Sequence, residues 1–181
     1  DLMDASKVSP ENITFNFAHL NFVEPINKTT AKFTEKFEAK DLELIENVPN
    51  AAAVVRADGR RLYRVLDNLF NNVAKYALPH TRVYVDLAEE DGYIRFSIKN
   101  ISEHPLNIRA DELTERFIRG DVSRSTEGSG LGLSIAQKLT ALQNGHFEIY
   151  LDGDLFRVTI SFVKTEESHE EQRQEAKHEE E

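Results

Sequence analysis

Cysteine is missing from all 181 residues of the chain. Disulfides, thiolate catalysis and zinc–thiolate sites are therefore excluded, and the composition fits a reducing cytoplasm. Long apolar runs are missing too. None approaches the roughly 20 residues of a membrane span, and we expect no direct membrane contact. Basic residues are few, with 22 Lys and Arg against 32 Asp and Glu. This balance argues against the basic surface that usually binds nucleic acid.

Negative charge is concentrated at one end of the chain. Residues 165–181 contain eight Glu against Arg173 and Lys177, which is −6 of the total net charge of −10. The segment has no apolar residue larger than Ala176 to bury, so we expect an acidic, disordered tail. Residues 1–10 are interpreted as the end of a preceding dimerisation helix or linker. Residues 11–164 are expected to form one globular domain.

Apolar spacing predicts three long helices between short strands. The helices are expected from Asn21 through Phe37, from Asp58-Gly59 through Val73, and from about Gly130 to Gln143, where Asn144-Gly145 stops the last one. Period-two alternation predicts strands around Ile13–Phe17, Leu42–Leu44, Ala53–Val55, Val83–Leu87, Ile94–Ile98, Phe147–Leu151 and Phe156–Phe162. Gly92 and Gly153 mark two hairpin turns. We expect one mixed sheet with the three helices on one face, an α+β two-layer sandwich.

Two carboxamides and a lysine share one face of the second predicted helix, because Asn68, Asn72 and Lys75 are spaced i, i+4, i+7. Asn is a mediocre helix former, so two in register need a reason. Magnesium takes oxygen ligands and keeps several waters while it binds phosphate, and a lysine one turn later reaches phosphate as a point charge. The pattern favours a magnesium–phosphate site. A solvated polar face explains the same spacing equally well.

Glycines alternate in Gly128–Leu133, just where the third predicted helix opens. Glycine allows close approach of phosphate to the backbone, and a helix start offers free N–H groups. The run is not a P-loop, because no Gly-Lys-Ser/Thr follows, and no strand directly precedes it as in a dinucleotide fingerprint. The alternative is a plain hinge. Upstream, the arginines of Glu115–Asp121 either close over a phosphate or belong to a salt-bridged surface helix.

Together and in this order, these segments resemble the boxes of one family: the ATP-binding catalytic domain of two-component sensor histidine kinases, within the gyrase, Hsp90, kinase and MutL superfamily. Leu66–Tyr76 is similar to the N box, Glu115–Asp121 to the F box, and Gly128–Leu133 to the second glycine box. The resemblance covers residues 13–162. It implies the Bergerat-type ATP-binding fold, with ATP and Mg²⁺ as ligands.

The resemblance also implies a role for each matching residue. Asn72 would be the principal magnesium ligand, with Asn68 assisting. Lys75 would contact phosphate, and Tyr76 would pack on the adenine. In the nucleotide lid, the implied residues are Phe117 and Arg119, with Arg119 near the terminal phosphate. The backbone that would wrap the phosphates belongs to Gly128, Ser129, Gly130, Leu131, Gly132 and Leu133.

The first glycine box departs from the family pattern, which usually reads Asp-x-Gly-x-Gly, with the Asp accepting a hydrogen bond from the adenine amine. The matching stretch here, Asn100–His104, reads Asn-Ile-Ser-Glu-His and has neither glycine. Asn100 still accepts through its carbonyl oxygen. A neutral acceptor forms a weaker bond than a charged one.

No histidine has the setting of a phosphoacceptor: Ser168-His169-Glu170 is not continued by the expected motif. We expect that histidine on a separate dimerising helix of the same protein, preceding Asp1. The predicted function is binding of Mg-ATP and transfer of its γ-phosphate to that helix, with a cognate response regulator as the further partner. The chain itself is expected to be monomeric and cytoplasmic, within a membrane-anchored sensor kinase.

The residue at position 68 favours phosphoryl transfer over ATP hydrolysis. By the resemblance, hydrolytic relatives carry a Glu where Asn68 stands, and the neighbouring carboxylate, Asp67, points about 100° away around a helix. Two alternatives stay open. One is a non-catalytic nucleotide-binding or docking module, suggested by the altered first glycine box. The other is an ATPase or serine kinase of the same superfamily.

Overall fold

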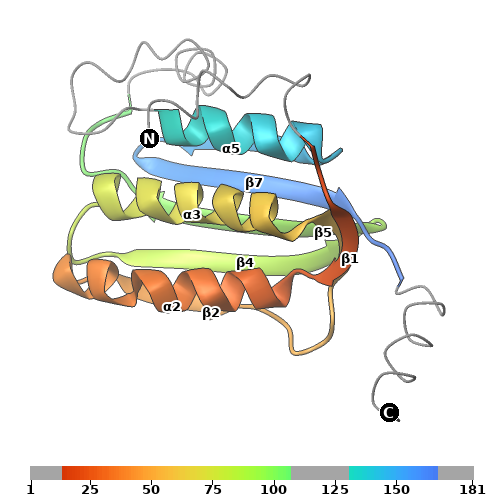
Figure 1. Ribbon diagram of the computed structural model, residues 1–181. Coiled ribbons are helices and arrows are strands. Elements are labelled where there is room, and N and C mark those ends of the chain that lie inside the picture. The colour runs from red at the N-terminus through yellow and green to blue at the C-terminus, as the bar shows by residue number, and fades with distance from the viewer. Residues whose placement is uncertain (1–13, 107–130, 167–181) are drawn as a thin grey trace.

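A computed structural model describes residues 14–106 and 131–166, which form a sheet with helices packed on one face (Figure 1). The helices are α2 (Val23–Ala39), α3 (Gly59–Tyr76) and α5 (Leu131–Leu142). The strands are β1 (Phe17–Asn21), β2 (Glu43–Asn47), β3 (Val54–Asp58), β4 (Arg82–Glu90), β5 (Tyr93–Ile101), β6 (His146–Asp152) and β7 (Leu155–Val163). The predicted α+β sandwich with three helices on one face is confirmed.

The main sheet has five strands in the order β2-β4-β5-β7-β6. It is mixed because β2 runs parallel to β4 while all other neighbours are antiparallel. Both predicted hairpins are present. Asp91 and Gly92 turn the first with φ values of 53° and 79°, and Gly153 turns the second with a φ of 57°. Positive φ at these positions matches the right-handed twist of the strands they join.

The strands β1 and β3 pair with each other as a separate two-stranded ribbon, whereas the sequence predicted a single sheet. The first strand is also shifted along the chain, because Leu20 and Asn21 pair with Val55 and Val54. The Asn21 side chain links this ribbon to α2. Its Oδ1 accepts from the N–H of Val23, at 3.2 Å, and from that of Ala53, at 3.1 Å.

Stacked phenylalanine rings hold the helix layer on the sheet. Phe70 of α3 stacks on Phe37 of α2, with ring centroids 6.0 Å apart, and on Phe96 of β5, at 6.4 Å. Phe22 extends the cluster from Phe96 to Phe162 of β7, at 6.0 Å from each. All five rings are buried, and each contributes about 1.5–3 kcal/mol by leaving water. The cluster therefore fixes how α3 is rotated on the sheet.

A buried polar junction fixes where α3 begins. Asp58 caps the helix as the sequence predicted, accepting from the backbone N–H of Arg61 at 3.1 Å. Its second oxygen accepts from the N–H of Asn16 at 2.9 Å, and its own N–H donates to Oε1 of Gln143 at 3.0 Å. Both Asp58 and Gln143 are buried. The ribbon, the start of α3 and the end of α5 are thus joined at one point.

The helix α5 ends as predicted at Asn144-Gly145. The first of these residues ends the helix through its backbone conformation, and the second is constrained by packing. Asn144, not Gly145, adopts the left-handed conformation, with a φ of 62°. At Gly145 the constraint is space. A Cβ there would lie 2.7 Å from a ring carbon of Phe162 and 2.8 Å from Cγ2 of Thr140, both in the core.

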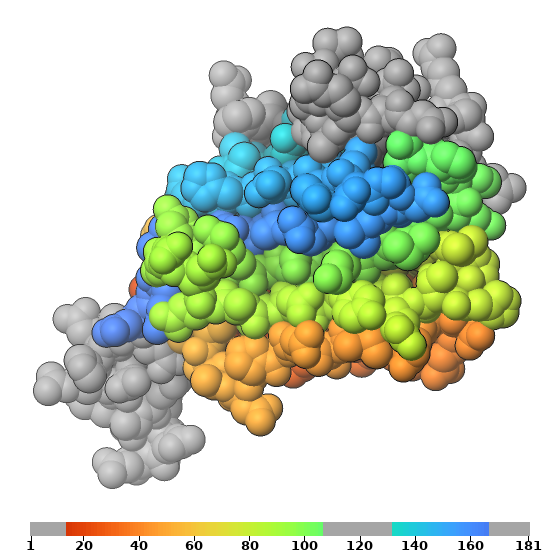
Figure 2. All heavy atoms as spheres, turned by 180° about the vertical axis from the view of Figure 1, so that it is seen from behind, coloured from red at the N-terminus to blue at the C-terminus, as the bar shows by residue number. Residues whose placement is uncertain are grey.

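The opposite face of the main sheet carries no helix within the described residues, and Figure 2 shows it from behind. Cations there lie over aromatic rings of neighbouring strands: Lys99 over Tyr84 at 4.9 Å, and Arg157 over Tyr150 at 4.5 Å. None of the helices in residues 14–106 and 131–166 combines the length and apolar character needed to span a membrane.

Replacing Gly145 with alanine is expected to lower the free energy of unfolding by about 1–3 kcal/mol, because the added methyl overpacks the core against Phe162. The matched control is Gly59→Ala. Its Cβ would meet only Leu20, at 3.9 Å, and alanine suits the first turn of a helix. Urea titration of both variants measures the difference. Equal midpoints for the two would contradict the packing role of Gly145.

Candidate functional site

The helix α3 has two polar edges that face different neighbours. Asp67 lies on the edge toward α2, where its carboxylate pairs with Nζ of Lys32. This hydrogen bond raises the pKa of the Lys32 ammonium above its ordinary value. Asn68 lies about 100° further around the helix, on the edge toward α5. The predicted separation of Asp67 from Asn68 is therefore confirmed.

The start of α5 lies directly against Asn68. A Cβ built on Gly132 would be 3.8 Å from Oδ1 of Asn68 and 3.9 Å from its Cβ, which is ordinary van der Waals distance. The structure thus brings Gly132, the last glycine of the run, against the carboxamide-bearing helix. Leu133, the next residue, is 2% exposed and belongs to the hydrophobic core.

Asn100 belongs to the face of β5 that the helices cover. It continues the buried alternation of Ile94, Phe96 and Ile98, and it is 3% exposed. Its Nδ2 donates to the carbonyl oxygen of Ile101 at 3.2 Å. This leaves Oδ1 as the acceptor directed into the helix layer. The family resemblance alone had selected Asn100, but the period-two pattern of its strand was a signal for this orientation.

Two buried amide atoms in this region lack hydrogen-bond partners among the described residues: Nδ2 of Asn68 and Oδ1 of Asn100. Leaving such an atom unpaired costs about 1–3 kcal/mol, so native proteins rarely do so without a reason. One atom is a donor on α3 and the other an acceptor on β5. A polar ligand between these elements would satisfy both.

Backbone hydrogen bonds hold the end of α3 against the end of β5. The N–H of Glu103 donates to the carbonyl of Tyr76 at 2.9 Å, and the N–H of Leu78 donates to that of Ile101 at 2.8 Å. Tyr76 is half-buried and Lys75 is exposed. The carbonyl of Lys75 accepts from Nζ of Lys40 at 3.3 Å. Three predicted residues, Lys75, Tyr76 and Asn100, therefore sit at this one end of the molecule.

The oxygen atoms available at this site suit a magnesium ion only if phosphate supplies further ligands. No three His, Asp or Glu side chains gather into a metal-binding group in the part of the chain that the structure describes. Asn68 and Asn72 offer neutral oxygens, which suits an ion that keeps waters and phosphate oxygens as its other ligands.

Several predicted site residues lie outside the described residues. They are the lid residues Phe117 and Arg119 and the first part of the glycine run, Gly128, Ser129 and Gly130. For Leu131 the backbone is described as the first residue of α5. The roles that the resemblance assigns to these residues stay predictions.

Comparison with known proteins identifies the family. Residues 57–175 match the family described as "Histidine kinase-, DNA gyrase B-, and HSP90-like ATPase". Among curated relatives, the adaptive-response sensory kinase SasA of Synechococcus elongatus is 25% identical over 88% of this chain. The sensor histidine kinase MtrB of Mycobacterium tuberculosis is 24% identical over 91%. The chain spans 42% and 30% of these two proteins, less than half of each.

Solved structures agree on the fold. The nucleotide-free catalytic domain of histidine kinase ThkA superposes with a TM-score of 0.73 at 24% identity, covering 83% of this chain and 97% of that domain. Full-length ShkA in complex with AMPPNP has a TM-score of 0.69 at 21% identity, covering 84% of this chain and 32% of ShkA. With the family match over residues 57–175, the chain belongs to the histidine kinase-, DNA gyrase B- and HSP90-like ATPase family.

Proposed function

We propose that this domain binds Mg-ATP between α3, α5 and β5 and transfers the γ-phosphate to a histidine on a separate phosphoacceptor helix. The observation that carries the proposal is the pair of buried, unpaired amide atoms, Nδ2 of Asn68 and Oδ1 of Asn100. ATP offers partners for both, namely phosphate oxygens for the donor and the adenine amine for the acceptor. The AMPPNP in the complex of ShkA, a similar fold, supports a nucleotide as the ligand.

Different residues would bind the magnesium ion, the phosphates and the adenine. Asn72, assisted by Asn68, would hold the magnesium ion, which supplies positive charge to the phosphates when bound. Lys75 is exposed one turn later and neutralises further phosphate charge. Asn100 reads the adenine at the other end of the ligand. Such a site acts by positioning and charge neutralisation, which is what phosphoryl transfer requires.

The surroundings of Asn68 favour transfer over hydrolysis. The nearest carboxylate along the helix, Asp67, is turned toward α2 and paired with Lys32. Asn68 itself has no basic oxygen that could activate water. The named relatives are sensor kinases longer than this chain. We therefore infer that the histidine is supplied by another domain and that a response regulator takes the phosphate onward.

Asn72→Ala is expected to weaken binding of a non-hydrolysable ATP analogue by at least about tenfold when magnesium is present. Without magnesium the change should be small, because the side chain acts through the ion. Isothermal titration calorimetry measures both conditions. Asn71→Ala, an equal truncation about 100° around the helix, is the control and should bind as the wild type does. Unchanged magnesium-dependent binding in Asn72→Ala would contradict the assignment.

Asn100→Leu separates recognition of the adenine from stability. The variant should lose most of the preference for the ATP analogue over the GTP analogue, by about tenfold, since the buried acceptor is gone. Its unfolding midpoint in urea should stay the same or rise, because an unsatisfied polar atom has left the core. A drop in stability with selectivity intact would show that Asn100 is structural. No detectable nucleotide binding in the wild type would instead favour a docking module.

Asn68→Glu should raise the release of inorganic phosphate from ATP by about tenfold or more, because it places a carboxylate where a general base can activate water. Asn68→Gln, of the same size and uncharged, is the control and should not accelerate hydrolysis. Phosphate release is followed in a steady-state assay. Fast hydrolysis by the wild-type chain would favour the ATPase alternative.

A further inference from the structure

A band of positive charge runs along the exposed edge between α2 and α3, on a protein whose net charge is −10. It is here called the basic seam. Its cations are Lys28, Lys32 and Lys36 of α2, Lys40 at the C-cap of that helix, and Arg60 at the start of α3. Three carboxylates lie among them, those of Glu24, Glu35 and Asp67.

The seam is one continuous edge because of helix geometry. The three lysines of α2 and its C-cap residue Lys40 are spaced i, i+4, i+8 and i+12, so they form one ridge. The ridge faces α3: Nζ of Lys32 pairs with Asp67, and Nζ of Lys40 donates to the carbonyl of Lys75 at 3.3 Å. Like charges at i, i+4 destabilise an isolated helix. The helix dipole likewise disfavours Arg60 in the first turn of α3, where the cap residue Asp58 is the acidic neighbour.

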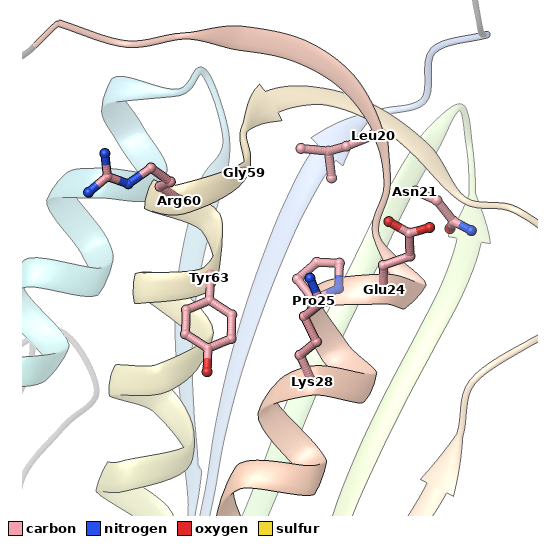
Figure 3. Close-up of a pocket in the computed structure, with 8 residues that line it drawn as sticks. All are labelled: Leu20, Asn21, Glu24, Pro25, Lys28, Gly59, Arg60 and Tyr63. Carbon is pink, nitrogen blue, oxygen red and sulfur yellow. The ribbon is translucent and has the colours of Figure 1, made fainter. Parts of the chain in front are cut away.

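One end of the seam opens into a groove of about 510 Å³ between the starts of α2 and α3. Leu20, Pro25 and Tyr63 give it an apolar lining. Figure 3 shows Lys28 beside Pro25 on α2 and Arg60 leaving the opposite rim. Both cations are exposed, and neither has an ion pair or hydrogen bond among the described residues. Glu24 lines the same groove, and the Arg60 side chain extends from the rim toward α5. The rim therefore carries one more cation than carboxylate, and such a rim beside an apolar lining suits a polypeptide that carries carboxylates.

The acidic end of the chain leaves the domain beside this groove. The N–H of Thr165 donates to the carbonyl of Val54 at 2.9 Å, and Oγ1 of Thr165 lies 3.1 Å from Nδ1 of His19. Val54 pairs in turn with Asn21, which lines the groove. Two strand spacings, about 10 Å, therefore separate Thr165 from the groove rim. An extended chain covers that distance within about four residues.

We propose that residues 167–181 dock into this groove and along the basic seam as an intramolecular acidic ligand. The segment carries seven Glu against Arg173 and Lys177, which complements the seam in sign. Thirteen extended residues from Glu166 to Glu179 span about 43 Å, longer than the roughly 27 Å of an 18-residue helix such as α3. Covalent attachment beside the groove raises the effective concentration of the segment. An acidic partner that uses the same seam must displace it.

The test uses the full chain, which has no cysteine and so accepts a unique spin label. A nitroxide attached to Ala176→Cys is expected to broaden the NMR signals of the backbone amides of α2 and of the first turns of α3. Their intensity should fall to about half of the value measured after the label has been reduced. Raising NaCl from about 0.05 M to about 0.5 M should restore most of the signal, because screening shortens to a few ångströms. The double variant Lys28→Glu/Arg60→Glu should reduce the broadening at least twofold.

The matched control is Arg95→Glu/Lys99→Glu, which makes the same change in charge on the open face of the sheet and should leave the broadening unchanged. Seam amides that stay sharp in the spin-labelled chain, or that are equally affected by both double variants, overturn the proposal. Broadening centred on β4, β5 and β7 overturns it in favour of the open face. Transfer of the broadening from spin-labelled to isotope-labelled molecules in a mixture overturns it in favour of a second copy.

Discussion

The burial of Phe70 between Phe37 and Phe96 is the constraint on which the site depends. It sets the rotation of α3 on the sheet, and successive residues of a helix differ by about 100°. With Phe70 inward, Asp67 meets Lys32 of α2, and Asn68 meets Gly132 of α5. A rotation by one residue would put the carboxylate of Asp67 in place of the carboxamide of Asn68 at the start of α5. The chemistry at that edge is thus fixed by an aromatic contact on the other side of the helix.

The same packing leaves unpaired amide atoms on α3 and β5, whereas the buried polar groups where α3 begins are paired. Asp58 uses both carboxylate oxygens, and Gln143 both accepts and donates. Asn68 and Asn100 each keep one buried atom unpaired. Apolar residues at these two positions would give a more stable domain. Hydrogen bonds are complete around Asp58, where α3 begins, and incomplete at Asn68 and Asn100. The energetic cost of the unpaired atoms therefore falls where we propose that a ligand binds.

The sequence predicted those parts of the fold that local patterns determine. Alternation located the hairpins, and Asp58-Gly59 located the start of α3, because turn and cap chemistry act over a few residues. The pairing of β1 with β3 was not predicted, since strand partners far apart leave no periodic signal. Gly145 was interpreted as a stop signal, whereas its close contact with Phe162 exists only in the packed structure. Spacing selected Asn68, Asn72, Lys75 and the glycine run, and the family resemblance gave them roles, but only the fold shows that Asn68 and Gly132 meet.

Net charge does not locate smaller charged patches on the surface, because it averages over regions that the fold separates. The total of −10 argued only against a nucleic-acid-binding surface. Every fourth residue from Lys28 to Lys40 is a lysine, and only helical geometry turns that spacing into a ridge. The ridge begins at Lys28 in the groove, whose rim lies about 10 Å from Thr165, and ends where Lys40 contacts the carbonyl of Lys75. An acidic chain held along it would lie on the two helices that orient Asn68, Asn72 and Lys75. Displacing that chain would change the electrostatic field at the phosphates without altering any residue that contacts them.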